Sequence, residues 1–154
     1  MRVAKAEEAQ AVTDVINAAF RRAESFFIER DRIDVEKVRS MFGTGEFLVC
    51  SKDEAVTGCV YVEMRGERSY LGLLAVDPTL QKSGRGSELM NAAEDHCRKA
   101  GSRFMDIQIV NLRKELPEFY HRRGYVETGT APLTAGIETK MPCHFVKMEK
   151  ALDR

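Results

Sequence analysis

The sequence predicts an α/β (α+β) fold with a mixed, mostly antiparallel sheet of about six to seven strands and flanking helices. Three short apolar runs joined by tight polar turns indicate an antiparallel meander in the first half of the chain. A strand, a helix and another strand follow, and such a crossover places the two strands parallel. Amphipathic segments on either side can cover the sheet.

The composition is that of an ordinary globular protein. The 154 residues are 44% apolar and 31% charged, which suits a single domain with one core. Lys plus Arg and Asp plus Glu number 24 each, so no net field favours nucleic acid or anionic lipid. The N-terminal segment lacks the apolar stretch of a signal peptide, and no run of 18 apolar residues occurs. We expect a cytoplasmic protein that binds neither nucleic acid nor membrane.

The cysteines predict free buried thiols and no metal site. No two of Cys50, Cys59, Cys97 and Cys143 are separated by only two or three residues, so the spacing of a zinc knuckle is absent. The histidines show no ligand spacing with each other or with the cysteines. Cys143 stands beside His144, but adjacent residues of a strand point to opposite faces and cannot readily act as a nucleophilic dyad.

The first half of the chain predicts a short strand at residues 2–5, two helices and the meander. Apolar residues recur at three and four positions over 7–22, the spacing of an amphipathic helix. Asp34 is a typical N-cap for a short second helix, which Gly43 would end. Residues 46–50, 55–64 and 69–76 predict the meander strands, and the last of these, SYLGLLAV, suits a strand buried on both faces.

The second half predicts alternating helices and strands. Pro78 halts the third meander strand, and a glycine-containing loop leads to a helix that Gly101 closes after Ala100. Residues 104–110 return as the parallel strand. A short helix over 117–123 and two strands near 125–128 and 143–148 complete the pattern.

The loop at residues 76–87, VDPTLQKSGRGS, has the features of a phosphate site. A helix N-terminus presents unpaired N–H groups and a partial positive charge, which together bind phosphate. Gly84 and Gly86 permit close approach and tolerate positive φ. Lys82 and Arg85 add charge-assisted contacts to a polyanion.

Other phosphate motifs fit this loop poorly. A dinucleotide fingerprint needs a third small residue where Leu89 stands, and a P-loop needs a lysine directly after its second glycine, where Ser87 stands. From spacing alone, an ordinary loop whose glycines only reverse the chain is an equally good interpretation.

The wider context of the loop resembles the acetyl-CoA signature of the GCN5-related N-acetyltransferase (GNAT) superfamily. Val-x-Pro is followed by Gln-x-x-Gly-x-Gly and an amphipathic helix, then by Asn111 after a strand. The segment FYHRRGY at 119–125 is similar to that family's aromatic-Tyr-x-x-x-Gly-aromatic motif. The resemblance is firm over 69–125 and implies that 1–154 form one acetyltransferase domain with a splayed parallel strand pair, acetyl-CoA as cofactor and a small-molecule or peptide amine as substrate.

The resemblance also implies which residues hold the cofactor. In that family, backbone amides of the glycine loop hold the pyrophosphate, and a bulge in the central strand opens a cleft for the pantetheine arm. The implied cofactor-binding residues are Leu74, Ala75, Val76, Gln81, Lys82, Ser83, Gly84, Arg85, Gly86, Ser87, Asn111 and Tyr120.

Acetyl transfer requires a deprotonated amine, a donor for the oxyanion and a proton for the departing thiolate. By its match to the family's tyrosine, Tyr120 is the implied general acid, since a phenol of pKa about 10 stays protonated near neutral pH. Its apolar helical spacing with Leu116 and Phe119 also suits a core tyrosine. A backbone N–H near Leu74 or Ala75 can hold the oxyanion, with direct attack in a ternary complex.

The general base stays open. Many relatives carry an acidic residue on the central strand, but SYLGLLAV contains none. Glu63 on the preceding strand is the first candidate, although an exposed carboxylate is the simpler interpretation, and Glu24, Asp106 or a water relay are alternatives. The missing acidic residue keeps a catalytically inactive acyl-CoA-binding sensor or interaction domain as the alternative function. Relatives often dimerise, so a homodimer is a further expectation.

Overall fold

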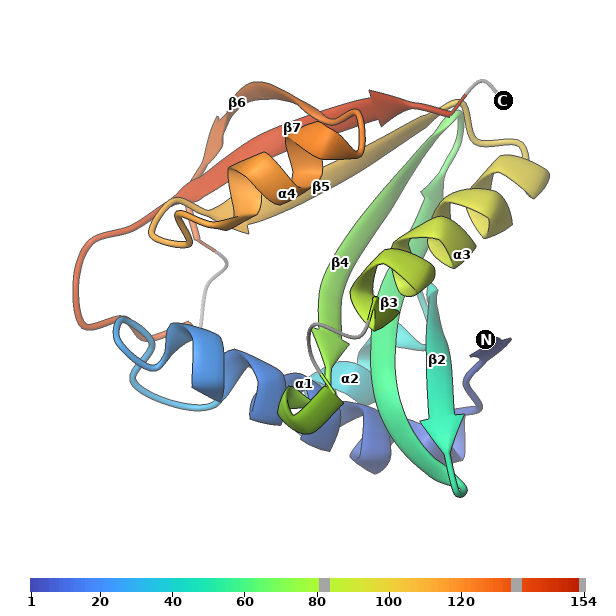
Figure 1. Ribbon diagram of the computed structural model, residues 1–154, viewed down its shortest axis with the longest axis horizontal. Helices are drawn as coiled ribbons and strands as arrows, with labels where there is room; N and C mark the ends of the chain where they lie inside the picture. The colour runs from blue at the N-terminus through green and yellow to red at the C-terminus, as the bar shows by residue number, and fades with distance from the viewer. Residues whose placement is uncertain (81–83, 134–136, 153–154) are drawn as a thin grey trace.

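The computed structural model describes residues 1–80, 84–133 and 137–152. Within these ranges seven strands form one sheet, with helices packed on both of its faces (Figure 1). The elements, in chain order, are β1 (Arg2–Val3), the 3-10 helix η1 (Ala6–Glu8), α1 (Ala9–Glu24), α2 (Val35–Met41), β2 (Glu46–Lys52), β3 (Ala55–Arg65), β4 (Arg68–Val76), the 3-10 helix η2 (Pro78–Leu80), α3 (Arg85–Lys99), β5 (Phe104–Val110), α4 (Leu116–Arg122), β6 (Val126–Ala131) and β7 (Phe145–Ala151).

The topology of the sheet confirms the predicted fold class. Its strand order is β1-β2-β3-β4-β5-β7-β6. Among the described strands, every neighbouring pair is antiparallel except β4 and β5, which the crossover through α3 joins in parallel.

Local signals explain most of the element boundaries. Asp34 caps α2 as predicted, because its Oδ1 accepts a hydrogen bond from the N–H of Lys37 at 2.8 Å. Gly101 ends α3 with φ +102°, a value that glycine adopts without strain. The last strand begins at Phe145, later than predicted, so Cys143 lies in the preceding loop and its placement in a strand was wrong. Within the described ranges all four cysteines are free thiols.

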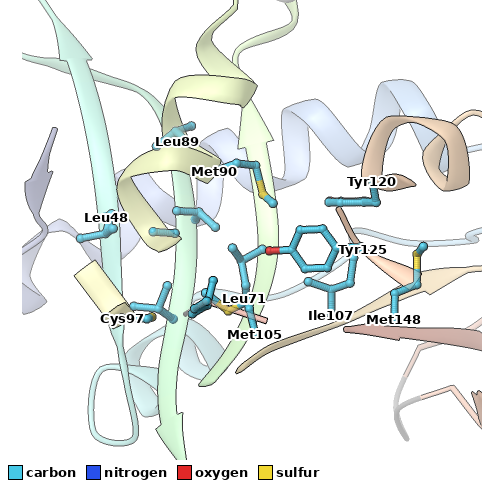
Figure 2. Packing of buried hydrophobic residues seen from close by; sticks show 14 of the residues in the cluster. Leu48, Leu71, Leu89, Met90, Cys97, Met105, Ile107, Tyr120, Tyr125 and Met148 are labelled. Atoms are coloured by element: carbon cyan, nitrogen blue, oxygen red, sulfur yellow. The ribbon is translucent and has the colours of Figure 1, made fainter. Parts of the chain in front are cut away.

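The two faces of the sheet carry separate cores. Helices α3 and α4 cover one face, where Leu89 and Met90 of α3, Leu71 of β4 and Tyr120 of α4 belong to one buried cluster (Figure 2). Helices α1 and α2 cover the other face through Val12, Ile16 and Val38 among other residues. Because β4 contributes side chains to both clusters, the apolar run at residues 71–76 is explained.

A bulge in β4 sets the shape of the sheet. On β3, one residue separates the partners of Ala75 and Gly72, whereas β4 places Leu73 and Leu74 in that interval. Leu73 has φ +52°, a left-handed value that is unusual for a non-glycine residue. The extra residue breaks the alternation of side chains along β4, so that both Gly72 and Leu73 are positioned toward the α1–α2 face.

Strands β4 and β5 pair at one end and then diverge. Among the described residues the ladder has three pairs, ending at Tyr70 and Asp106. Arg68 holds the closed end together, since its Nε donates to Asp106 Oδ2 at 2.8 Å and its Nη2 contacts Glu149 of β7. Figure 1 shows the two strands separating from this end, with α1 lying across the wide end.

Candidate active site

A cleft of about 610 Å³ fills the space between the diverging strands. Its walls come from β4 and β5, its ends from α1, the first turn of α3, and α4. These segments are far apart in the sequence and meet because β4 and β5 separate beyond Tyr70. The residues that line it from β4 are Tyr70, Leu71, Gly72, Leu73, Leu74, Ala75 and Val76.

The first turn of α3 opens onto this cleft. Gly84 is the N-cap residue with φ +83°, and Gly84, Arg85, Gly86 and Ser87 all line the cleft. A Cβ built on Gly84 or Gly86 meets no described atom within 4 Å, so the backbone there is open to close approach by a ligand. The unpaired N–H groups of a helix start attract anions. Gln81, Lys82 and Ser83, also predicted for this loop, lie outside the described residues.

Tyr120 faces the same cleft from α4. The residue is 6% exposed, and its ring stacks edge-on with Phe119 and Tyr125. Within residues 1–80, 84–133 and 137–152 its hydroxyl has no hydrogen-bond partner. Burial raises the pKa of Tyr120 to about 12, so the phenol is protonated at neutral pH and can donate its proton into the cleft.

Asn111 does not line the cleft. It follows β5 directly, but its Oδ1 accepts the backbone N–H of His144 at 2.8 Å, and its own N–H donates to the carbonyl of His144 at 2.9 Å. The side chain therefore ties β5 to the segment before β7. The expected contact of Asn111 with the cofactor stays a prediction, because only the partner of its side-chain oxygen is seen here.

Glu63 and Asp106 also lie outside the cleft lining. The Oε1 of Glu63 accepts from the hydroxyl of Tyr61 at 2.7 Å, and its Oε2 accepts from Arg65 Nε at 2.6 Å. These two hydrogen bonds lower the pKa of Glu63, which makes its carboxylate a weaker base. Asp106 is engaged by Arg68 at the closed end of the strand pair.

Glu24, the weaker candidate from sequence, does line the cleft. Its carboxylate is buried at the end of α1, and its Oε2 accepts from Arg113 Nη1 at 2.9 Å. Its Oε1 lies 3.5 Å from Arg32 Nε, and neither atom has a hydrogen-bond partner among the described residues. Glu115 also binds Arg113, with 2.8 Å between Oε2 and Nε. The two carboxylates and two guanidiniums thus compensate one another where α1 meets the β5–α4 loop.

A second cleft of about 770 Å³ opens on the α1–α2 face. It shares Arg32, Tyr70, Leu73 and Phe145 with the first cleft, so the two meet beside the β4 bulge. Its walls combine α1 and the segment after it with Ile137 and Glu138. The cleft thereby brings together parts of the first 45 residues and of the segment after β6, which are far apart in the sequence.

The comparison with known families agrees with this geometry. A family model for the acetyltransferase (GNAT) domain matches residues 5–152. The chain belongs to the GNAT acetyltransferase family. Members of this family are acetyl-CoA-dependent acetyltransferases that act on amines. No curated protein sequence matches the chain significantly.

Solved structures share the GNAT fold of this chain at low sequence identity. An N-acetyltransferase from Staphylococcus aureus Mu50 is 16% identical with a TM-score of 0.77, and the match covers 99% of this chain and 97% of that one. A ribosomal-protein-alanine N-acetyltransferase from Brucella melitensis is 18% identical with a TM-score of 0.74, covering 97% and 98%. An aminoglycoside 6′-N-acetyltransferase, complexed with coenzyme A, is 16% identical with a TM-score of 0.74, covering 100% and 98%.

Three residues that line the first cleft, Arg32, Tyr70 and Arg113, were not predicted as site residues from the sequence. Arg32 and Arg113 lie in segments without a motif, and nothing local indicates that they meet Glu24. Tyr70 could have been found from the sequence, since a tyrosine two residues before a glycine on a strand can lie over that glycine on the same face.

In the described part of the chain, no cluster of His, Cys, Asp or Glu could hold a metal ion. None of the described helices has the length and apolar character that a membrane span requires.

Proposed function

We propose that this GNAT protein is a single-domain N-acetyltransferase that uses acetyl-CoA to acetylate a primary amine of a small molecule or peptide by direct attack in a ternary complex. The observation that carries the proposal is the cleft between the diverging strands β4 and β5, which Tyr120 lines. Tyr120 presents a protonated phenol that has no hydrogen-bond partner in the described ranges. Acetyl-CoA, when bound, supplies the acetyl group as a thioester.

The residues around the first cleft fit that cofactor. The open helix start at Gly84 and Gly86 suits a diphosphate, with Arg85 beside it for charge-assisted contacts. Beyond Tyr70, β4 has no ladder to β5 in the described residues, so its backbone toward the cleft suits the amides of a pantetheine arm. We assign this role to Leu74 and Ala75, and Val76 is a further proposed cofactor contact because it lines the same cleft. Gln81, Lys82 and Ser83 belong to the same proposed loop.

Tyr120 is the proposed general acid. Its phenol is protonated at neutral pH because burial holds its pKa at about 12, and it can protonate a leaving thiolate in the cleft. A backbone N–H of β4 next to the bulge, at Leu74 or Ala75, is the proposed donor to the oxyanion.

Proton removal from the amine is assigned to water. Two carboxylates line the first cleft within the described residues, Glu24 and Glu115, and both are bound to Arg113. Glu63 does not line this cleft. Because both carboxylates are already paired with a guanidinium, neither is assigned as the base. The amine would reach the bulge from the second cleft, on the α1–α2 face, while the cofactor occupies the first.

The pairing of both carboxylates that line the first cleft with Arg113 is the observation that favours the alternative, an acyl-CoA-binding domain without catalysis. The two functions are separated by incubating the purified protein with acetyl-CoA and a panel of amines that includes amino acids, polyamines, aminoglycosides and peptide N-termini. Free thiol and acetylated product are measured together, and coenzyme A binding is measured by calorimetry.

The proposed function predicts equal amounts of thiol and acetylated amine with at least one acceptor. Coenzyme A binding without any product supports the non-catalytic alternative. No binding of coenzyme A at all rejects both, because each depends on the first cleft.

A further inference from the structure

Tyr70 lies where the two clefts meet. It occupies the last position of β4 that pairs with β5, and its side chain lines both the first and the second cleft. It packs against the core of the α1–α2 face, whereas Tyr120 belongs to the core of the opposite face. Tyr70 is also the one polar side chain that β4 contributes to either cleft within the described residues.

Gly72 determines the position of the Tyr70 ring. A Cβ built on Gly72 would lie 2.8 Å from both Cε2 and the hydroxyl oxygen of Tyr70, closer than two unbonded atoms can approach. The ring and its hydroxyl therefore lie over Gly72, the residue directly before the bulge at Leu73. Arg65 stacks on the ring, 4.8 Å from its centroid, and helps to hold it there.

The Tyr70 hydroxyl is free for a ligand. It has no hydrogen-bond partner among the residues that the structure describes. Burial raises the pKa of Tyr70, against the opposing effect of Arg32 and Arg65, so the group is a neutral phenol that can accept or donate a hydrogen bond. Tyr70 and Tyr120 both line the first cleft.

We propose that Tyr70 binds the acceptor amine at the bulge, where its hydroxyl oxygen accepts an N–H of the neutral amine and directs the nitrogen lone pair toward the first cleft. Gly72 is the positioning residue that allows the phenol to lie there. This inference rests on the proposed acetyltransferase function. The two tyrosines then act from opposite faces of the sheet, Tyr70 on the nucleophile and Tyr120 on the leaving group.

Steady-state kinetics of three variants, Tyr70→Phe, Gly72→Ala and the double variant, test the proposal. Tyr70→Phe removes only the hydroxyl, and Gly72→Ala displaces the ring without altering its chemistry. Loss of one hydrogen bond to the substrate lowers kcat/KM for the amine about tenfold in each single variant. The KM for acetyl-CoA stays within about twofold, and the double variant falls no further than either single one, because both changes remove the same contact.

Matched controls are Tyr61→Phe and Gly129→Ala. Tyr61 lies on the neighbouring strand 6.5 Å from the Tyr70 ring, centroid to centroid, but lines neither cleft. A Cβ on Gly129 meets no described atom within 4 Å. Both controls should keep the wild-type kcat/KM for the amine.

Two results would overturn the inference while leaving the proposed function intact. One is an active wild type whose kcat/KM for the amine is unchanged by Tyr70→Phe. The other is a double variant that loses the product of the two single effects, which would show that Gly72→Ala acts through the backbone. If Gly72→Ala does not fold, Tyr70→Phe decides alone, because it keeps the ring. A wild type inactive toward every amine rejects the proposed function and this inference with it.

Discussion

Replacing Tyr120 with phenylalanine should abolish most activity without weakening the fold. The change deletes one hydroxyl and keeps the ring that packs between Phe119 and Tyr125. A buried hydroxyl without a partner costs the folded state about 1 kcal/mol or more, and none is found for Tyr120 in the described part of the chain. We therefore expect the free energy of unfolding to stay the same or rise by up to about 1 kcal/mol.

The expected effect of the same substitution on catalysis is much larger. A general acid contributes about 10²–10⁴-fold to the rate, which corresponds to about 3–5 kcal/mol of barrier. The assay is kcat from free-thiol release with the best acceptor, and coenzyme A binding should stay within about twofold. Because burial holds the pKa of Tyr120 at about 12, the wild-type rate should not fall on the alkaline side up to about pH 10.

Tyr125→Phe is the control for this prediction. Its hydroxyl donates to Glu94 at 2.9 Å within the buried core, so its loss should destabilise the protein by about 1–2 kcal/mol while kcat is retained. The reasoning about Tyr120 is refuted if Tyr120→Phe loses stability as Tyr125→Phe does and keeps its turnover rate.

Three further substitutions test other parts of the structure. Gly86→Val should raise the KM for acetyl-CoA about tenfold or more at unchanged melting temperature, because a side chain there meets no described protein atom but obstructs the helix start. Glu24→Gln should lower the free energy of unfolding by about 1–3 kcal/mol in urea titrations, since Arg113 loses a buried charge partner. Hydrogen bonds from Arg2 and then the Lys5 backbone lower the pKa of Glu8 from 4.5 to about 2, so this contribution to stability is present above pH 4.5 and lost as the pH falls toward 2. The stability difference between wild type and Arg2→Gln should shrink over that window in pH-dependent thermal melts.

Each of these tests has a result that would contradict it. Unchanged KM for acetyl-CoA in Gly86→Val, with Gly129→Val as the matched control, removes the helix start from the cofactor site. Equal stability of Glu24→Gln and wild type shows that water, rather than Glu24, satisfies Arg113. A constant difference between wild type and Arg2→Gln from pH 7 to pH 2 shows that Arg2 does not lower the pKa of Glu8.

The secondary structure could be predicted from the sequence because its determinants are local. Asp34 caps its helix, Gly101 ends another, and the period of apolar residues distinguishes helices from strands without knowledge of the partner elements. The crossover rule then requires β4 and β5 to be parallel. Motif order led to the GNAT family for the same reason, since the loop, the helix and the Tyr120 segment are each contiguous in the chain.

The composition of the clefts depended on contacts between distant segments. Glu24 meets Arg113 from 89 positions away, and Asn111 turns to His144 because that backbone N–H needs an acceptor. Neither of these two choices is encoded in a local pattern. Glu63 is the exception, because Tyr61 and Arg65 lie two residues before and after it on the same strand, where side chains share a face.

The sequence by itself determined the elements, their order and the family, whereas the tertiary structure decided which side chains reach the site. The physical reason is the bulge at Leu73. Period-two alternation assigns each strand residue to a face, but one extra residue reverses that assignment for the rest of β4. Whether the extra residue is accommodated depends on the register with β3 and on the early end of the ladder with β5, and both are properties of the assembled sheet.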